Sequence, residues 1–255
     1  MPAQPAPTAK SRRRDIILLG IAVIAAIALA AALLMRHTHQ DNGSTPRSTV
    51  AVAPPTSSTT GPRPALGPLG EVARRQTGDP LALGSPDAPI VLVEFADLRC
   101  PFCAEFSRNT EPVLVQRYVS SGVLRIEWRD MPIFGPQSRD AARAARAAAA
   151  QGRFWPFVQT VYSTAPATGH PDLSAAKLHD IARQVGVPDL ARFDTDAAST
   201  HFDAAIDADL AQGQSLGIPS TPAFSMNGHP VLGAQPTDVF TTLVDDLAAG
   251  KPTEK

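Results

Sequence analysis

The chain has 255 residues, a formal net charge of −1, 44% hydrophobic residues and only two cysteines. The near-neutral balance hides an asymmetry: residues 1–50 carry six basic and two acidic side chains, a balance of +4, which leaves −5 on residues 51–255. The larger part therefore lacks the basic charge that nucleic-acid-binding domains carry, and we expect no nucleic acid partner. Residues 79–255 are numerous enough to form one compact domain.

The twenty residues 16–35 contain no charged side chain. As a helix they would span about 30 Å, the thickness of a bilayer core. Four basic residues within residues 10–14 precede this run, so the positive-inside rule places residues 1–15 in the cytosol and the later residues outside. A cleaved signal peptide is the alternative, with residues 28–30 (Ala-Leu-Ala) as its cleavage site, but that cut would fall within the apolar run. We predict one transmembrane anchor at residues 16–35 and a single-pass protein of the cell membrane.

Residues 36–78 are rich in Pro, Ser and Thr and contain few large apolar side chains. Such a segment buries too little surface to offset the entropy lost on ordering. We therefore predict a disordered linker over residues 36–78, which tethers an extracytoplasmic domain at residues 79–255 to the membrane.

Cys100 and Cys103 stand two residues apart and are the only cysteines of the chain. A zinc site needs about four ligands, and neither a second cysteine pair nor closely spaced histidines follow, so we expect no metal. A permanent structural disulfide is the second alternative, but so short a loop gives little stabilisation. The pair follows an apolar run at residues 90–95 and precedes a helix-like stretch at residues 104–118. A strand, a CxxC pair and a helix are the arrangement expected of a thioredoxin-type redox site.

The remaining elements predict an α/β domain. Short and long strands at residues 82–83 and 90–95, a helix that bends near Pro112, and a strand at residues 123–128 give a β-α-β start. Helices are expected at residues 137–151, 154–162, 173–185, 190–198 and 202–216. Strands at residues 223–226 and 230–232, joined by Asn227-Gly228, form a hairpin, and residues 237–248 form a last helix. This order is a thioredoxin fold interrupted by a helical subdomain at about residues 137–216.

Three stretches carry a family resemblance: VEFADLRCPFC at residues 93–103, GRFW at residues 152–155 and GIPSTPAFSMNG at residues 217–228. At these positions the chain resembles the DsbA-like thiol:disulfide oxidoreductases, and in particular the membrane-anchored bacterial kind similar to BdbD. The resemblance covers roughly residues 81–249. It implies an enzyme without a bound cofactor whose clients are exported proteins with cysteine thiols.

The resemblance also implies roles for single residues. Cys100 is the expected nucleophile, because the first turn of a helix favours its thiolate, and Cys103 is the expected resolving cysteine, more buried than its partner. Thr221 and Pro222 are expected to form a cis peptide bond whose backbone pairs with a client chain. From the residues alone, an ordinary trans proline is the alternative. Glu94 corresponds to a buried acid that carries a proton for Cys103. The alternative there is a glutamate on an edge strand that points into water.

The residues between the cysteines, Pro101 and Phe102, are also expected to contact the client. Phe102 departs from the family pattern, because the strongest oxidants of the family carry a histidine between the two cysteines. Threonine before the expected cis-proline, here Thr221, likewise resembles the less oxidising relatives. His170 is expected to be a surface or capping residue.

The leading hypothesis is an enzyme that introduces disulfides into exported proteins and is recharged by a quinone-linked membrane oxidase of the DsbB-like or VKOR-like kind. A second hypothesis keeps the chemistry but reverses it, as a disulfide reductase or isomerase. A third is a non-catalytic binding or chaperone module, which would keep its full activity after both cysteines become serine.

Overall fold

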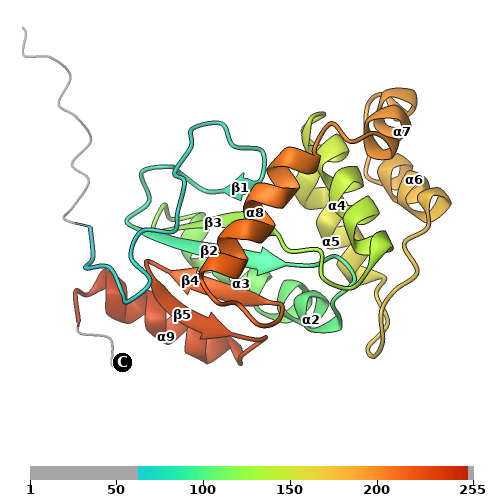
Figure 1. The fold of residues 1–255 in the computed structure, drawn as a ribbon. Helices are drawn as coiled ribbons and strands as arrows, with labels where there is room; N and C mark the ends of the chain where they lie inside the picture. The colour runs from blue at the N-terminus through green and yellow to red at the C-terminus, as the bar shows by residue number, and fades with distance from the viewer. Residues whose placement is uncertain (1–62, 252–255) are drawn as a thin grey trace, which may run out of the picture. The chain divides into compact units, whose positions relative to one another are not determined.

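The computed structural model describes residues 63–251, which form a five-stranded sheet with the strand order β1-β3-β2-β4-β5 (Figure 1). The strands are β1 (Ala82–Leu83), β2 (Ile90–Ala96), β3 (Leu124–Asp130), β4 (Ala223–Met226) and β5 (His229–Leu232). The central strand β2 runs parallel to β3 and antiparallel to β4, and antiparallel pairs attach β1 and β5 at the two edges. The predicted β-α-β start and β-β-α end are confirmed.

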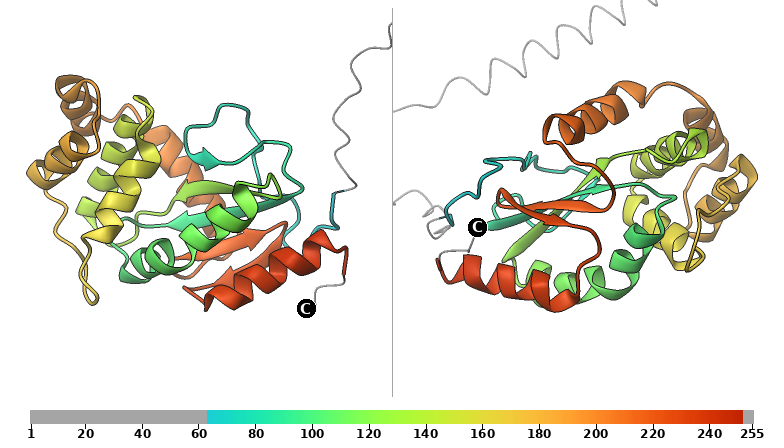
Figure 2. Two further views of the ribbon diagram at one scale, coloured as in Figure 1. Left: turned by 180° about the vertical axis from the view of Figure 1, so that it is seen from behind. Right: turned by 60° about the horizontal axis from the view of Figure 1, so that its bottom comes forward.

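Helices cover both faces of this sheet, as the two views of Figure 2 show. The helices are α2 (Pro101–Asn109), α3 (Glu111–Leu114), the π-helix η1 (Val115–Val119), α4 (Pro136–Ala149), α5 (Phe154–Ser163), α6 (Ala175–Gln184), α7 (Leu190–Ala198), α8 (Asp203–Ser215) and α9 (Thr237–Ala248). Helices α2, α3 and α9 lie against one face, and α8 crosses the other. Helices α4 to α8 come between β3 and β4, which confirms the predicted helical insertion.

The strand β2 is buried on both faces, as its continuous apolar sequence predicted. Successive side chains of a strand point to opposite faces. Leu92 belongs to the main apolar core, on the side of α2 and α9, whereas Val93 and Phe95 belong to a smaller cluster on the side of α8. Glu94 shares the face of Leu92, so its carboxyl group points toward the helix that follows the cysteines.

The side chains of β3 also point alternately to the two faces of the sheet, and both of these faces are buried. Ile126 and Trp128 point into the main core. Arg125, Glu127 and Arg129 point to the opposite face, where a period-two pattern alone would indicate solvent, yet all three are buried. This second face is covered by α8 and by the chain segment that precedes β1.

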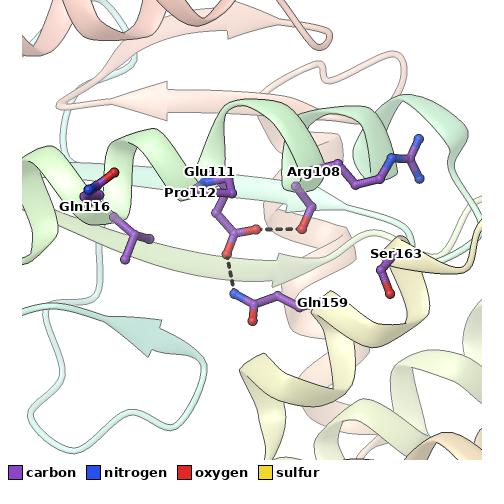
Figure 3. A pocket seen from close by; sticks show the side chains of 8 residues that line it. Arg108, Glu111, Pro112, Gln116, Gln159 and Ser163 are labelled. Atoms are coloured by element: carbon purple, nitrogen blue, oxygen red, sulfur yellow. Dashed lines mark hydrogen bonds between the residues drawn. The ribbon is translucent and has the colours of Figure 1, made fainter.

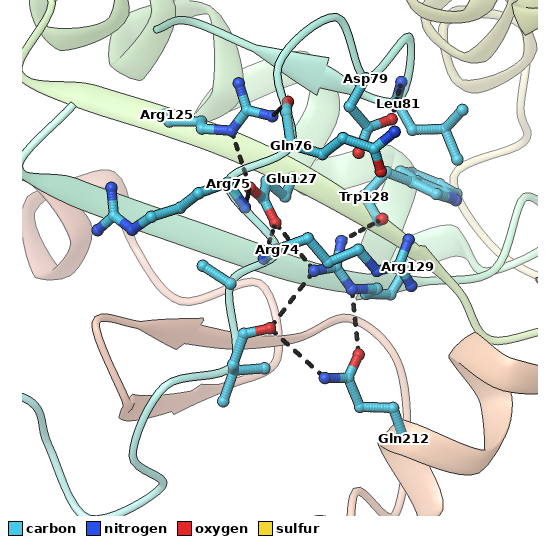
Figure 4. Close-up of polar contacts among 12 residues, drawn as sticks. Arg74, Arg75, Gln76, Asp79, Leu81, Arg125, Glu127, Trp128, Arg129 and Gln212 are labelled. Carbon is cyan, nitrogen blue, oxygen red and sulfur yellow. Dashed lines mark hydrogen bonds and ion pairs between the residues drawn. The ribbon is translucent and has the colours of Figure 1, made fainter. Parts of the chain in front are cut away.

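Glu127 is the centre of the buried polar network on that face (Figure 4). Its carboxylate accepts hydrogen bonds from the backbone N–H groups of Arg74 and Arg75, both at 2.8 Å, and from the side chains of Arg125 at 2.8 Å and Arg129 at 2.9 Å. Burial by itself would raise the pKa of Glu127, but these donors more than offset it and lower the pKa to about 2. The network therefore holds an ionised carboxylate inside the fold.

The predicted boundary between linker and domain at residue 78 is wrong, because residues 67–78 already belong to the packed structure. Gly67 N–H donates to the Asn227 carbonyl at 2.8 Å, and Leu69 N–H donates to the Gly228 carbonyl at 2.9 Å. Val72 is buried, and Arg74 forms an ion pair with Asp209 on α8. The segment has few apolar residues, and backbone hydrogen bonds and charge pairs attach it to the sheet.

The predicted cytosolic N-terminus at residues 1–15, the anchor at residues 16–35 and the linker up to residue 62 lie outside the described residues. Within residues 63–251, no helix combines the length and the hydropathy that a membrane span requires.

The predicted hairpin between β4 and β5 is confirmed. The backbone conformation of its turn explains why the two turn residues are asparagine and glycine. Asn227 and Gly228 have positive φ angles of 46° and 82°, the left-handed region in which asparagine and glycine are favoured. A Cβ atom at Gly228 would lie 2.5 Å from the Gly70 carbonyl oxygen, so only glycine fits against the N-terminal segment. The same turn thus closes the hairpin and receives residues 67–70.

The helical run that follows the cysteines is interrupted two residues before Pro112, near which a bend was predicted. Helix α2 ends at Asn109, its C-cap Thr110 has φ −105° and ψ −47°, and α3 begins at Glu111. The run then widens into η1, which closes with the Ser120 N–H donating to the Val115 carbonyl five residues earlier. The break places Glu111 at the start of a new helical segment, with its side chain buried.

Candidate active site

Cys100 is the N-cap of α2, at the carboxyl end of the loop that leaves β2. Its backbone is extended, with φ −79° and ψ 121°, and Pro101 fills the first helical turn, where no N–H is needed. The Cys103 N–H donates to the Cys100 Sγ at 3.4 Å, so the sulfur takes the place of a capping oxygen. Both cysteines are buried, whereas Phe102 is 60% exposed.

The surroundings stabilise Cys100 as a thiolate. The hydrogen bond with the Cys103 side chain has the largest effect; burial opposes it, and hydrogen bonds from Thr221 and from the N–H groups of Cys103 and Phe102 add to it. Together they lower the pKa of Cys100 to about 6. A substantial fraction of the Cys100 thiol groups is therefore ionised at neutral pH.

Cys103 has the opposite environment. It lies one turn into α2 with no exposed surface. Burial, followed by the hydrogen bond to Cys100 and the charge of that residue, raises the pKa of Cys103 well above its usual value. The two thiols thus differ in the way a nucleophile and a buried resolving thiol must differ.

The loop before β4 lies directly against Cys100. The Thr221–Pro222 peptide bond is cis, and the Cys100 thiol donates to the Thr221 carbonyl across 3.2 Å. The Thr221 hydroxyl is buried and has no hydrogen-bond partner within residues 63–251. The structure therefore brings together the cysteine pair and the Thr-Pro step, 121 residues apart in the chain.

Glu94 lies beneath the same helix. It is 1% exposed on the central strand, which excludes the alternative of an edge-strand glutamate in water. Its register partners Trp128 and Phe224 share its face of the sheet, where the Trp128 ring packs on α5 and the Phe224 ring packs on Phe106 of α2. Burial, followed by the charges of Glu111 and Cys100, raises the pKa of Glu94 well above its usual value.

Asp97 shapes the loop between β2 and the cysteines, and sequence reasoning had given it no role. One carboxylate oxygen accepts the Arg99 N–H at 2.8 Å, and the other accepts the N–H groups of Ile133 at 2.7 Å and Phe134 at 3.1 Å. Its carbonyl accepts the Cys100 N–H at 3.0 Å. An aspartate directly before a turn and three residues before a helical N-cap is a local signal that could have identified it.

Arg99 and His170 connect this loop to the helical insertion. The Arg99 guanidinium donates to the carbonyls of Phe134 at 2.7 Å and Pro171 at 3.0 Å. The His170 Nδ1 lies 2.9 Å from the Arg99 carbonyl, and its ring packs on Phe134 with centroids 4.3 Å apart. His170 is exposed, as expected, but it also contacts the residue that precedes Cys100.

A shallow apolar pocket of about 160 Å³ lies beside the loop that carries Pro222. Its wall includes Phe95, Ile218, Pro219 and the half-exposed Leu232. Pro219 and Ala223, which also lines it, flank the Thr-Pro step on both sides in the chain. The pocket therefore places apolar side chains beside the Thr-Pro step, at the edge formed by β4 and β5.

Comparison with known proteins identifies the class. The thioredoxin family profile matches residues 76–246, which is more than half of the chain. The chain therefore belongs to the thioredoxin family. This match includes the cysteine pair, the helical insertion and the β4–β5 hairpin.

Curated relatives and solved structures show more specifically which proteins the chain resembles. A sodium/proton antiporter, NhaA 1 of Mycolicibacterium gilvum, is 31% identical over 172 residues, 66% of this chain and 26% of that protein. The chain spans about a quarter of the length of this relative. The probable disulfide bond formation protein D of Bacillus cereus is 26% identical over 151 residues, 58% of this chain and 70% of that protein.

Among solved structures, the oxidised form of BdbD from Bacillus subtilis superposes with a TM-score of 0.64 at 20% identity, over 74% of this chain and 100% of that one. A thioredoxin-like oxidoreductase from Silicibacter pomeroyi gives 0.56 at 28% identity, over 68% and 99%. The α-DsbA1 protein of Wolbachia pipientis gives 0.60 at 23% identity, over 68% and 92%. The stated resemblance to DsbA-like and BdbD-like proteins is confirmed.

Proposed function

We propose that this chain is a thiol:disulfide oxidoreductase that passes a disulfide from Cys100 and Cys103 to client proteins. The observation that carries the proposal is the asymmetry of the two thiols. Cys100 caps a helix with its pKa lowered to about 6, whereas Cys103, one turn away, is buried and its pKa is raised. Membership of the thioredoxin family alone does not distinguish an enzyme of thiol–disulfide exchange from a relative that shares only the fold. The asymmetry of the two thiols supports thiol–disulfide exchange.

The reaction begins when a client thiolate attacks the Cys100 sulfur of the oxidised enzyme. A mixed disulfide forms, the Cys100–Cys103 bond breaks, and Cys103 leaves as a thiolate that takes up a proton. A second client thiolate then attacks the client sulfur of the mixed disulfide, and Cys100 leaves as a thiolate. Two electrons pass from the client dithiol to the enzyme dithiol. The low pKa of Cys100 makes it the better leaving group in the second step.

Glu94 is proposed to supply the proton that Cys103 needs. A buried thiolate is costly, and burial raises the pKa of the nearby Glu94 carboxyl and so favours its protonated form. Proton transfer from Glu94 to the Cys103 sulfur would neutralise the leaving group without exposing it to water. In the reverse direction, the same carboxylate would accept the proton when Cys103 attacks a mixed disulfide.

The client chain is proposed to lie along the loop of Thr221 and Pro222. Its side chains would contact the exposed Phe102, the neighbouring Pro101 and the apolar pocket beside Leu232. An extended chain in this position would reach the Cys100 sulfur from the side of the Thr221 carbonyl. Exported proteins with cysteine thiols are the proposed clients.

We propose that the domain works outside the cytosol, anchored by residues 16–35, and is recharged by a quinone-linked membrane oxidase of the DsbB-like or VKOR-like kind. The uncharged run and the preceding basic residues support the anchor. The names of two relatives, a sodium/proton antiporter and a probable disulfide bond formation protein, fit a protein associated with the membrane or with export.

A disulfide reductase or isomerase is the second candidate. Phe102 favours it, because a histidine at this position would add a cation next to the Cys100 thiolate, and phenylalanine does not. A less stabilised thiolate makes the enzyme disulfide a weaker oxidant. The chemistry of the site is the same in both directions.

The test is the oxidation of a reduced, unfolded test protein by the oxidised full chain. We expect disulfides to form at a rate that Cys100→Ser abolishes. Cys103→Ser, mixed with an oxidised client, should accumulate a covalent complex through Cys100. If the variant with both cysteines replaced by serine acts on the client as well as the wild type, the chain is a binding or chaperone module and the proposal is wrong.

A further inference from the structure

The proposed reaction leaves a proton supply to be explained, because neither Cys103 nor Glu94 reaches solvent. Cys103 has no exposed surface and Glu94 is 1% exposed. Within the described residues, the Glu94 carboxylate forms no hydrogen bond that would connect it to the surface. After Glu94 has given its proton to Cys103, a second group must return one before the next cycle.

Glu111 is a second buried carboxyl group in the same layer of the fold, and the proposed reaction does not use it. It is 2% exposed, and burial, which outweighs its two hydrogen bonds, raises its pKa. Its oxygens accept the Ser107 hydroxyl at 2.7 Å and the Gln159 amide at 3.1 Å (Figure 3). These partners fix the carboxyl group between the start of α3 and the helix α5.

The position of Glu111 connects it to solvent on one side. A cavity of about 480 Å³ lies at this junction, and Glu111, Ser107 and Gln159 all line it. The other lining residues include the exposed side chains of Arg108 and Gln116. Figure 3 shows the Glu111 carboxyl group between α3 and Gln159 of α5, so water that enters this cavity would meet it.

On the other side, Glu111 faces the redox site. Cys103, Ser107 and Glu111 follow one another at intervals of four residues, so they share one side of the helical run from α2 to α3. Glu94 lies on the sheet face beneath this run, next to Phe224, whose ring packs on α2. After burial, the charge of Glu111 is the next cause of the raised pKa of Glu94, as expected for two carboxyl groups within electrostatic reach of each other.

We propose that Glu111 is a positioning residue that acts through Glu94: it returns protons from the solvent cavity to Glu94 and so resets the acid that serves Cys103. This inference rests on the proposed thiol–disulfide exchange. The Ser107 hydroxyl donates to Glu111 and can also accept, and it lies one helical turn after Cys103, so we assign it as the proton carrier on the side of Glu111.

Each step of this relay moves one proton and no electrons. Glu94 gives its proton to the departing Cys103 thiolate and becomes a carboxylate. Glu111 gives its proton toward Glu94 by way of the Ser107 hydroxyl. The Glu111 carboxylate then takes a proton from water in the cavity. When Cys103 attacks a mixed disulfide, the same steps run in reverse and release the proton to the cavity.

The experiment uses the reduced full chain and an aromatic disulfide, dithionitrobenzoate, which releases a coloured thiolate in two steps. The first release reports attack by Cys100, and the second reports attack by Cys103 on the mixed disulfide, for which Cys103 must lose its proton. The two phases therefore test the proposed exchange and the relay separately. If the first phase is lost in the wild type or survives in Cys100→Ser, the proposed function is wrong.

We expect Glu111→Gln to leave the first phase unchanged and to slow the second phase by about tenfold, less than the roughly 10²–10⁴-fold effect of a group that transfers the proton directly. The pH at which the second phase rises should also move downward, because the neighbouring charge that raises the pKa of Glu94 is gone. A purely structural role would not move this inflection. Glu105→Gln, at an exposed carboxyl group on the neighbouring helix α2, is the matched control and should change neither phase.

Two further variants make the result decisive. Glu94→Gln should slow the second phase, and adding Glu111→Gln to it should slow it no further, because both act on one path. Glu111→Asp keeps a carboxyl group and should restore most of the rate, which separates the relay from a packing defect. The inference is overturned if Glu111→Gln changes neither the rate of the second phase nor the pH of its inflection. It is also overturned if the effects of the Glu94→Gln and Glu111→Gln substitutions on the rate multiply, or if Glu111→Asp is as slow as Glu111→Gln.

Discussion

The Thr221 hydroxyl offers a sharp test of how the fold sets the acidity of Cys100. It is buried and has no hydrogen-bond partner among the residues that the structure describes, while the neutral Cys100 thiol donates to the Thr221 carbonyl at 3.2 Å. When Cys100 ionises, that donor disappears and the hydroxyl can turn to donate to the thiolate. Thr221→Val removes the hydroxyl and keeps the branched shape, so it removes this hydrogen bond from the ionised state only.

The size of the effect follows from the structure. A hydrogen bond to a charged group contributes about 1.5–3 kcal/mol, and for a diffuse sulfur anion we take the low end, about one pKa unit. The pKa of Cys100 should therefore rise from about 6 toward about 7. At neutral pH the reduced enzyme is then about 1 kcal/mol less stable relative to the oxidised enzyme. This difference lowers the reduction potential by about 20 mV.

The assay is the pH dependence of the ultraviolet absorbance of the thiolate, or of the rate of alkylation of Cys100. Ser220→Ala removes an exposed hydroxyl next in the chain and serves as the control, with no change in the titration. At pH values well below 6, Thr221→Val should be at least as stable as the wild type, because the buried hydroxyl has no partner there. An unchanged Cys100 titration in Thr221→Val would refute this explanation of the thiolate.

The other expectations concern the second thiol, the buried network and the motif. Alkylation of the reduced chain at mildly acidic pH should modify Cys100 and spare Cys103, as mass spectrometry of the digested protein would show; equal labelling would contradict the assigned roles. Glu127→Gln should lower the free energy of unfolding in urea at neutral pH by about 3–5 kcal/mol, because it leaves buried guanidinium groups unpaired. The pKa of Glu127 is about 2, below the unfolded value of about 4.3, so this stability is present above about pH 4 and is lost as the pH falls toward 2; a difference from wild type that persists at pH 2 would oppose the argument. Phe102→His should lower the pKa of Cys100 further and raise the reduction potential, measured against glutathione; a fall in potential would contradict the electrostatic reasoning.

The sequence predicted the regular elements well because each carried a strong local pattern. The continuous apolar run of β2, the Asn227-Gly228 turn and the alanine-rich α4 were all found within a few residues of the expected positions. The separation of Cys100 from the Thr-Pro step is 121 residues, and only the family resemblance predicted that these two would meet.

Other features depend on long-range burial, which no local pattern reports. Residues 67–78 look like linker because they carry few apolar side chains, yet backbone donors at Arg74 and Arg75 satisfy Glu127 inside the fold. The alternation of β3 indicated a polar face in solvent, and α8 covers it. Glu111 resembles any first-turn helical glutamate in sequence, and only the packing of α5 against it makes it a buried acid.

The reduction potential of the Cys100–Cys103 couple tests the central claim most directly. The full chain is equilibrated with mixtures of reduced and oxidised glutathione, and the fraction of dithiol is read after acid quenching and alkylation. Helix-terminal stabilisation of Cys100 without a histidine at position 102 leads us to expect about −120 to −200 mV, between a strong oxidant and a disulfide isomerase. A value near about −270 mV, that of thioredoxin, would contradict an oxidising role and assign the chain to the reductases.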